Sequence, residues 1–162
     1  MRTAKDDEDR KKLWTARKRA FGALGLLAPN YMTQDGTVPR SPLPKMLRFI
    51  GEVSKKYDIP IANVFHVGDG NLHPIVLFDK RDSDQVERVH MVNKEILQAC
   101  VDAGGTISGE HGIGVEKQEF MPLIFSEEDM DFMVTIRNIF NPTQLCNPKK
   151  IFPIDKTIEI TP

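Results

Sequence analysis

The sequence is poor in cysteine, in net charge and in long apolar runs. Its 162 residues include two cysteines, Cys100 and Cys146, with no Cys-x-x-Cys spacing, so reduced thiols in a reducing compartment explain them most simply. A formal net charge of −1 gives no reason to expect a nucleic-acid or membrane partner. With 40% apolar residues, the composition instead predicts one ordinary globular domain with a sizeable core.

The apolar runs that are present are far too short to span a bilayer. The N-terminus, Met-Arg-Thr-Ala-Lys-Asp-Asp-Glu, is charged and lacks the apolar region of a secretory signal. There is no internal repeat and no low-complexity segment. These absences predict a cytoplasmic protein that does not span a membrane.

The most informative stretch runs from His66 to His73 and reads His-Val-Gly-Asp-Gly-Asn-Leu-His. Apolar runs flank its glycine-rich centre, and an Asp-Gly pair between such runs is a strong signal for a β-hairpin with a type I′ turn. If Asp69 and Gly70 are the central turn residues, His66 lies directly opposite His73. Opposed residues have Cβ atoms roughly 4.5–5.5 Å apart, which would let two imidazoles bind one divalent metal.

A third ligand could come from residues 109–114, Gly-Glu-His-Gly-Ile-Gly, which follow a short β-type run at 106–108. Neighbours in extended backbone point to opposite faces, so Glu110 can face a metal while His111 faces a substrate. Two histidines and one carboxylate form a recurring open metal site. Alternatively, His66 is an ordinary hydrogen-bonded histidine and the glycines only form turns. That alternative accounts for either histidine alone, whereas a metal site accounts for both motifs together.

Four helices are predicted from the spacing of apolar residues. The first covers 6–24 and the third 85–103, and the fourth begins at 126–129. The second is capped by Ser41, begins at Pro42 and runs through Tyr57. A loop and a short strand fill 25–34, 35–39 forms a turn, and proline pairs after residue 140 predict an extended tail. The residues expected to face the core are Leu13, Trp14, Phe21, Leu24, Leu43, Leu47, Ile50, Val53, Val86, Val89, Asn93, Ile96, Leu97, Cys100, Met130, Met133, Val134, Ile136, Ile139 and Phe140.

Helices that alternate with short strands and one hairpin predict an α+β fold, with an antiparallel or mixed sheet covered by helices. The chain begins with a helix and has no obvious first strand to sit beside the hairpin, so we expect it to be the second part of a larger unit. On the first helix, Arg17 lies at the edge of the apolar face and can point toward an anion. His90 lies far from any glycine loop and is expected to be structural.

Three motifs carry a resemblance to a known family. They are His-x-Gly-Asp-Gly-Asn-x-His at 66–73, Ser-Gly-Glu-His-Gly-Ile-Gly at 108–114 and Asn-Pro-x-x-Leu-x-Asn-Pro-x-Lys at 141–150. Together they resemble the C-terminal part of the FAD-linked oxidases of the vanillyl-alcohol oxidase type. Trp-x-x-Arg at 14–17 and Asp-Gly-Thr-Val-Pro-Arg at 35–40 narrow the resemblance to the D-subunit group of bacterial glycolate oxidases. It runs from about residue 10 to residue 153.

The resemblance implies a flavin enzyme that oxidises a small D-2-hydroxy acid, such as glycolate or D-lactate, to the 2-oxo acid. Residues 1–120 would be part of a ferredoxin-like substrate and metal (cap) domain, and 121–162 a C-terminal helix and tail that pack on an FAD-binding domain. FAD would be bound mainly by that domain or subunit, because this chain has no Gly-x-Gly-x-x-Gly fingerprint. Further glycolate oxidase subunits, including an iron–sulfur subunit, are implied partners and would place the protein at the periphery of a membrane.

The resemblance also implies roles for individual residues. His66, His73 and Glu110 would bind a divalent metal, zinc or manganese. His111 would be the catalytic base, accepting the proton of the substrate hydroxyl. The remaining implied contacts are Arg17 with the substrate carboxylate, Asn71 with substrate and flavin, and Asn147 with the flavin.

Some positions depart from the family pattern. Lys149 stands where the family tail usually has a glycine, so a side chain occupies a position where the backbone usually turns. Thr33 and Phe21 stand where relatives that act on diacids have a lysine and a threonine, which favours a small monoacid. Two alternatives of another class are a free-standing metal-binding module or inactive remnant, and a metallohydrolase in which Glu110 or His111 activates water.

Overall fold

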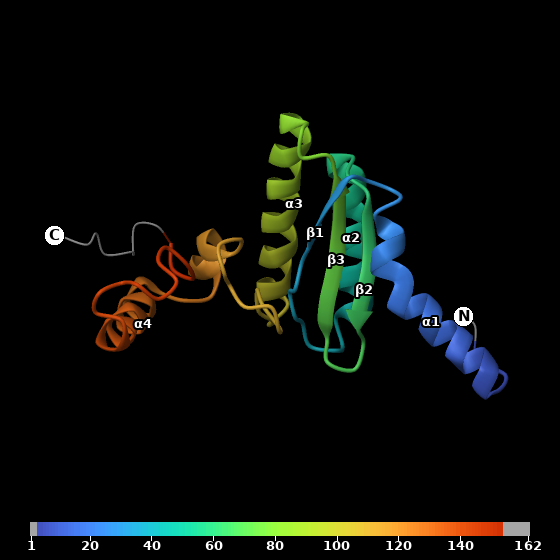
Figure 1. The fold of residues 1–162 in the computed structure, drawn as a ribbon, viewed down its shortest axis with the longest axis horizontal. Coiled ribbons are helices and arrows are strands. Elements are labelled where there is room, and N and C mark those ends of the chain that lie inside the picture. Colours follow the sequence, from blue (N-terminus) through green and yellow to red (C-terminus); the bar gives the residue numbers. More distant parts are fainter. Residues whose placement is uncertain (1–2, 154–162) are drawn as a thin grey trace.

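One antiparallel three-stranded sheet, in the order β1-β3-β2, lies at the centre of the fold (Figure 1). The structure is a computed structural model that describes residues 3–153, apart from the side chain of Arg17. The α+β prediction is confirmed. The elements in chain order are α1 (Asp7–Leu24), β1 (Asn30–Thr33), α2 (Leu43–Tyr57), β2 (Ile61–His66), β3 (Asn71–Phe78), α3 (Ser83–Asp102), the 3₁₀ helix η1 (Gln118–Leu123) and α4 (Glu127–Phe140).

Helices cover both faces of the sheet, and the central strand β3 is therefore buried along nearly its whole length. On one face, α2 and α3 pack against each other and against the sheet. On the other face, Leu24 at the end of α1 packs against Ile75 and Leu77 of β3. The larger cluster, between the sheet and α2 and α3, includes Ile50, Val53, Leu72, Val76, Val92, Ile96 and Cys100.

β2 and β3 form the predicted hairpin, but the predicted register is wrong. His66 pairs with Asn71 and Val64 with His73, so residues 67–70 connect the strands in place of a two-residue type I′ turn. The amides of Asp69 and Gly70 both donate to the His66 carbonyl, at 3.2 and 3.1 Å. Because side chains alternate with period two, this slip of two residues leaves His66 and His73 on the same face of the sheet. Their ring centroids lie 5.4 Å apart.

Capping side chains mark the observed starts of α1 and α3, but not the start of α2. Asp6 caps α1 by accepting from Asp9 N, as the predicted start at 6 requires. α3 begins two residues before the predicted 85, because the Asp82 carboxylate accepts from the amides of Asp84 and Gln85. The prediction that Ser41 caps α2 is wrong, because Pro42 is the N-cap residue and no side chain caps this helix.

Half of the twenty predicted core residues are buried, and five are exposed. Trp14 is exposed because α1 extends past the sheet and only its C-terminal end packs (Figure 1). Val86, near the start of α3, is also exposed. On α4, Met130 is buried, but the remaining apolar side chains form a stripe wider than the surface that the described residues offer them. The exposed members of that stripe are Ile136, Ile139 and Phe140, together with Phe132, which the sequence did not predict as a core residue.

α4 lies away from the sheet beyond α3, and η1 lies between these two helices (Figure 1). Phe120 of η1 packs with Leu97 of α3, whereas Met121 of η1 packs with Met130 and Phe152 in a small cluster under α4. α4 begins with a capping box between Ser126 and Asp129, which confirms the predicted helix start. The tail is not extended as predicted, because several residues after α4 have positive φ and turn the backbone. They are Gln144, Asn147, Lys149 and Ile151.

Residues 34–38, here called the strap, form an extended segment and not the predicted turn at 35–39. Thr37 makes β-bridges with Asn71 on one side and with Thr106 on the other. The predicted strand at 106–108 is reduced to this single bridge. Leu72 N donates to the Gly36 carbonyl and Thr106 N to the Thr37 carbonyl, each at 2.9 Å. The strap therefore lies between the start of β3 and the loop at 108–114, here called the site loop.

His90 links α3 to η1, with its Nε2 3.3 Å from a carboxylate oxygen of Glu119.

Among the residues described, no helix combines the length and the apolar character that a membrane crossing requires.

Candidate metal centre

His73 is a nearly buried histidine on the central strand, and its two ring nitrogens have different partners. Nδ1 lies 3.1 Å from the Gln34 carbonyl, which can only accept, so Nδ1 carries a proton. In the neutral ring the Nε2 lone pair then faces Glu110 Oε1 at 2.9 Å. Two electron-pair donors at this distance need a positive charge on or between them, from a proton or a metal ion. A metal-bound histidine usually donates its other ring N–H to a carbonyl or carboxylate in the same way.

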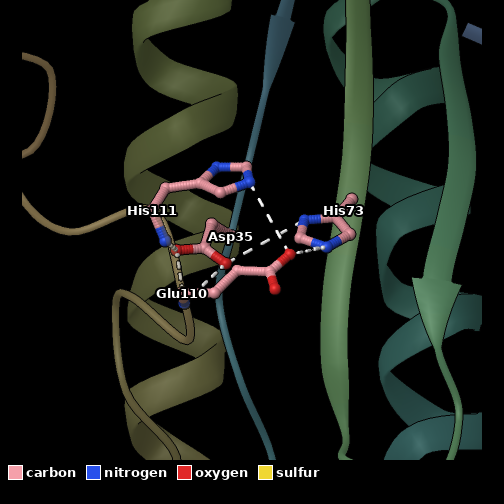
Figure 2. Close-up of side chains that lie close together, drawn as sticks. All are labelled: Asp35, His73, Glu110 and His111. Atoms are coloured by element: carbon pink, nitrogen blue, oxygen red, sulfur yellow. Dashed lines mark hydrogen bonds and ion pairs between the residues drawn. The ribbon is translucent and has the colours of Figure 1, made fainter.

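Glu110 Oε1 lies among three imidazoles, of which Figure 2 shows those of His73 and His111. In addition to the contact with His73, it lies 3.9 Å from His66 Nε2 and 3.8 Å from His111 Nε2. The rings of His73 and His111 are stacked, with centroids 5.0 Å apart and planes 11° apart. Glu110 and His111 are half-exposed, so the centre opens to solvent on one side and is closed by β3 on the other.

The structure brings together the three predicted metal ligands, although by a different route from the one expected. His66 reaches the carboxylate from a diagonal position in the hairpin, and not from directly opposite His73. Four residues form a tighter group, namely Asp35, His73, Glu110 and His111. Each offers one ligand atom, and these four atoms all lie within 4.8 Å of one another. His66 therefore lies at the edge of this group, and His111 lies within it.

The expectation that Glu110 and His111 point to opposite faces is wrong. Both side chains turn toward His73 (Figure 2). The reason is that the site loop is bent, and not extended, at residues 109–111. The alternation of side chains holds only for extended backbone.

Asp35 is the site residue that the sequence reasoning missed. It lies in the strap and is fully buried. Its partners are 73–82 residues away along the chain, so no local pattern indicates them. The carboxylate accepts hydrogen bonds of 2.7–3.2 Å from Ser108 Oγ, from the backbone amides of Gly109, Glu110 and His111, and from Lys117 Nζ.

These contacts keep Asp35 ionised. Burial alone would raise its pKa, but hydrogen bonds from Ser108, His111 and Glu110 and the charge of Lys117 outweigh burial and hold the pKa well below its usual range. Oδ2 accepts from all of these donors, whereas Oδ1 accepts only from Glu110 N, at 3.2 Å. Oδ2 is therefore committed to holding the site loop.

A polar hollow of about 370 Å³ adjoins the centre, and Asn71 lies on its wall. Asn71 is buried, shares a face of the sheet with the two histidines of the hairpin, and lies 3.4 Å from Thr37 Oγ1 through its side-chain oxygen. A Cβ added at Gly109 would lie 2.8 Å from the Asn71 amide, so only glycine fits there. The other lining residues are Thr37, His66, Asp69, Thr106, Ser108, Gly109 and Glu110.

The structure does not place the other two predicted contact residues at this centre. Arg17 belongs to α1, but its side chain lies outside the described part of the chain. Asn147 is exposed in the tail beside α4, and its carbonyl accepts from Arg137 at 2.9 Å. Their predicted roles stay predictions.

The donor set fits a divalent metal. It combines imidazole nitrogens, a carboxylate and an open side, as catalytic metal sites do. The buried face is already hydrogen-bonded, whereas Glu110 Oε1 and the facing His73 Nε2 need a proton or a metal ion between them. FAD as a whole does not fit the hollow beside Asn71, which is large enough for a small acid or one edge of a ring system.

Comparison with known proteins identifies the family. The family described as FAD linked oxidases, C-terminal domain, matches residues 1–151. Glycolate oxidase subunit GlcD of Escherichia coli (strain K12) is 42% identical over 153 residues, which cover 94% of this chain and 31% of that protein. A probable mitochondrial D-lactate dehydrogenase of Danio rerio is 34% identical over 95% of this chain and 31% of its own length.

A more distant relative, the D-2-hydroxyglutarate dehydrogenase of Stutzerimonas stutzeri (strain A1501), is 28% identical over 92% of this chain and 32% of its own length. The chain therefore spans about a third of the length of these curated relatives. By the family match over nearly its whole length, the chain belongs to the FAD-linked oxidases and contains their C-terminal domain.

Proposed function

We propose that this chain is the substrate- and metal-binding part of an FAD-dependent dehydrogenase that oxidises a small D-2-hydroxy acid to the 2-oxo acid. The observation that carries the proposal is the convergence of His73, Glu110 and His111 on one open point. Family membership supports the reaction class, and the three relatives compared above are named as enzymes of 2-hydroxy acids.

In this proposal, His66, His73 and Glu110 hold a divalent metal, zinc or manganese. When bound, the metal would supply a Lewis acid that polarises the hydroxyl of the substrate. His111, half-exposed and 3.8 Å from Glu110, would accept the hydroxyl proton. Hydride transfer from the α-carbon requires the flavin, so the chain alone should be inactive and colourless.

Contacts with substrate and flavin are assigned from the family resemblance. Arg17 would bind the substrate carboxylate, Asn71 the substrate and flavin, and Asn147 the flavin. The position of Asn71 on the polar hollow supports its part in this assignment. For Asn147, support is limited to its exposure in the tail.

The proposed division is a partial cap domain at 1–120 and a C-terminal segment at 121–162 that packs on an FAD-binding domain. The separate cluster under α4 supports the boundary, and the exposed apolar stripe supports the packing. Ile139 is 70% exposed and Phe140 83% exposed, which is unusual for such side chains unless another surface covers them. An iron–sulfur partner and a cytoplasmic, membrane-peripheral location are further parts of the proposal and follow from the resemblance alone.

A small monoacid is the substrate class we favour, glycolate or D-lactate. Phe21, which stands where diacid-oxidising relatives have a threonine, packs with Leu24, Ile75 and Leu77 and offers no donor to a second carboxylate. The identities favour glycolate, since the relatives named for glycolate are 39–42% identical, those named for D-lactate 28–34%, and the one named for D-2-hydroxyglutarate 28%.

The test is activity after co-expression with an FAD-binding domain of this family. The purified complex should be yellow and should reduce an artificial electron acceptor with glycolate or D-lactate, but much more slowly with L-lactate or D-2-hydroxyglutarate. A yellow, metal-loaded complex that oxidises no 2-hydroxy acid would refute the proposed reaction and favour a metal-binding module.

A further inference from the structure

Two consecutive residues of the strap reach both halves of the metal centre. The Gln34 carbonyl accepts from His73 Nδ1 at 3.1 Å. The next residue, Asp35, holds the site loop through its carboxylate. The strap is itself fixed to β3, because Gln34 N donates to the Pro74 carbonyl at 2.9 Å. The strap thus connects the strand that carries His73 to the loop that carries the other donors.

We propose that Asp35 is a positioning residue that sets where Glu110 and His111 lie relative to His73. This inference rests on the metal site proposed above, and the experiments below separate the two. Asp35 acts through the backbone of the site loop, so it is not expected to contact metal or substrate.

The physical argument is the geometry of three consecutive amides. The N–H groups of Gly109, Glu110 and His111 all point at the Asp35 carboxylate, at 2.8–3.2 Å. Successive amides can converge on one anion only if the backbone curves around it. In extended backbone, Glu110 and His111 would point apart. The curvature around Asp35 is therefore what turns both side chains toward His73.

Two side chains reinforce this arrangement. Ser108 Oγ donates to the Asp35 carboxylate at 2.7 Å and accepts from Gly112 N at 2.8 Å, which closes the loop on itself. Lys117 Nζ, nearly buried and 3.1 Å from the carboxylate, supplies the opposite charge. Replacing Asp35 by asparagine would keep one acceptor oxygen but remove the negative charge that faces Lys117 and the second oxygen that accepts from Glu110 N, so the hold on the loop would weaken.

The experiment measures metal binding by the full chain, with zinc chloride in competition with a chromophoric chelator and with cobalt(II) absorption as a report of ligand geometry. Asp35→Asn should weaken zinc affinity about 10–100-fold, the range seen for partners that orient metal ligands, and should change the cobalt spectrum. The matched control is Asp79→Asn. Asp79 pairs with Arg81 at the opposite end of β3, and its loss should leave both readouts unchanged.

Ser108→Ala covers the case in which Asp35→Asn does not fold. It removes one donor to the carboxylate and leaves the three amides in place, so a smaller, several-fold loss of zinc affinity is expected. Ser108→Thr keeps the hydroxyl and should restore most of the affinity. An unchanged zinc affinity in Ser108→Ala would then overturn the proposal.

Amide hydrogen exchange in the metal-free chain gives a readout that does not depend on metal. In Asp35→Asn, the amides of residues 109–111 should lose protection, while those of β3 and α3 keep theirs. Uniform loss of protection across β3 and α3 would show a general structural role and overturn the proposal, as would wild-type zinc affinity with an unchanged cobalt spectrum. If the wild-type chain binds neither zinc nor cobalt, the proposed metal site fails, and the exchange pattern alone decides the role of Asp35.

Discussion

Replacing Lys117 by methionine should destabilise the protein strongly, because it leaves the Asp35 carboxylate buried without a counter-charge. Lys117 is 5% exposed, Asp35 is fully buried, and the two groups are 3.1 Å apart. Removing one partner of a buried ion pair typically costs about 3–5 kcal/mol. The Ser108 hydroxyl and three backbone amides remain on the carboxylate, so we expect about 2–3 kcal/mol here.

For a chain of this length, each kcal/mol shifts the melting temperature by roughly 2–4 °C, so the midpoint should fall by about 4–12 °C. Urea unfolding followed by circular dichroism and differential scanning calorimetry measure both quantities. The control is Lys56→Met, because Lys56 pairs with Glu95 at 2.7 Å on the surface, where an ion pair contributes little. The double variant Asp35→Asn with Lys117→Met should lose less stability than the sum of the single variants. A Lys117→Met protein as stable as Lys56→Met would refute the reasoning.

Three further predictions concern the proposed metal centre, the two cysteines and the C-terminal tail. In the enzyme reconstituted with an FAD-binding domain, His111→Ala should keep its metal and lose about 10²–10⁴-fold in turnover, roughly 3–5 kcal/mol of barrier, whereas Glu110→Gln should lose metal first and recover part of its turnover in excess metal. Rescue of His111→Ala by metal would mean that the two roles are reversed. In thiol titration with a disulfide reagent, the exposed Cys146 should react in the native protein and Cys100 only after denaturation, because burial raises the pKa of Cys100 to about 12; two fast native thiols would contradict this. Lys149→Gly should raise the free energy of unfolding by about 0.5–1 kcal/mol, because Lys149 has a φ of 56°, which glycine adopts with less strain. Urea unfolding measures this change, and no gain in stability would contradict the prediction.

The hairpin shows how far local patterns carry a structural prediction. Its two strands and their apolar faces are correct, because period-two alternation is a local property. The turn is wrong because Gly70 meets the strap, where its carbonyl accepts from Val38 N at 3.0 Å. That contact is distant in sequence, and it favours a four-residue connection over the two-residue turn. The shared face of His66 and His73 was predictable only because the register error was an even number of residues.

The metal centre shows a different limit. His73 and Glu110 could be found because histidines and glycines cluster in two short motifs. Asp35 could not, since its sequence neighbourhood predicts a turn and all its donors lie in a loop far along the chain. The exposed stripe on α4 has a related cause. A helical apolar pattern shows that a face is to be covered but not what covers it, so Ile139 and Phe140 were expected in a core that the described residues do not provide.

The donors of the proposed metal centre come from the β2–β3 hairpin and from the site loop, which the strap joins only in the native topology. An unfolded chain therefore offers no preformed chelate, and loading of the proposed metal would follow folding. A metal that binds only the native form would stabilise it by about 2.7 kcal/mol at a free concentration one hundred times its dissociation constant. Cells short of the metal would then accumulate a chain that unfolds more readily and is more open to proteolysis, so metal supply would control the amount of this protein as well as its chemistry.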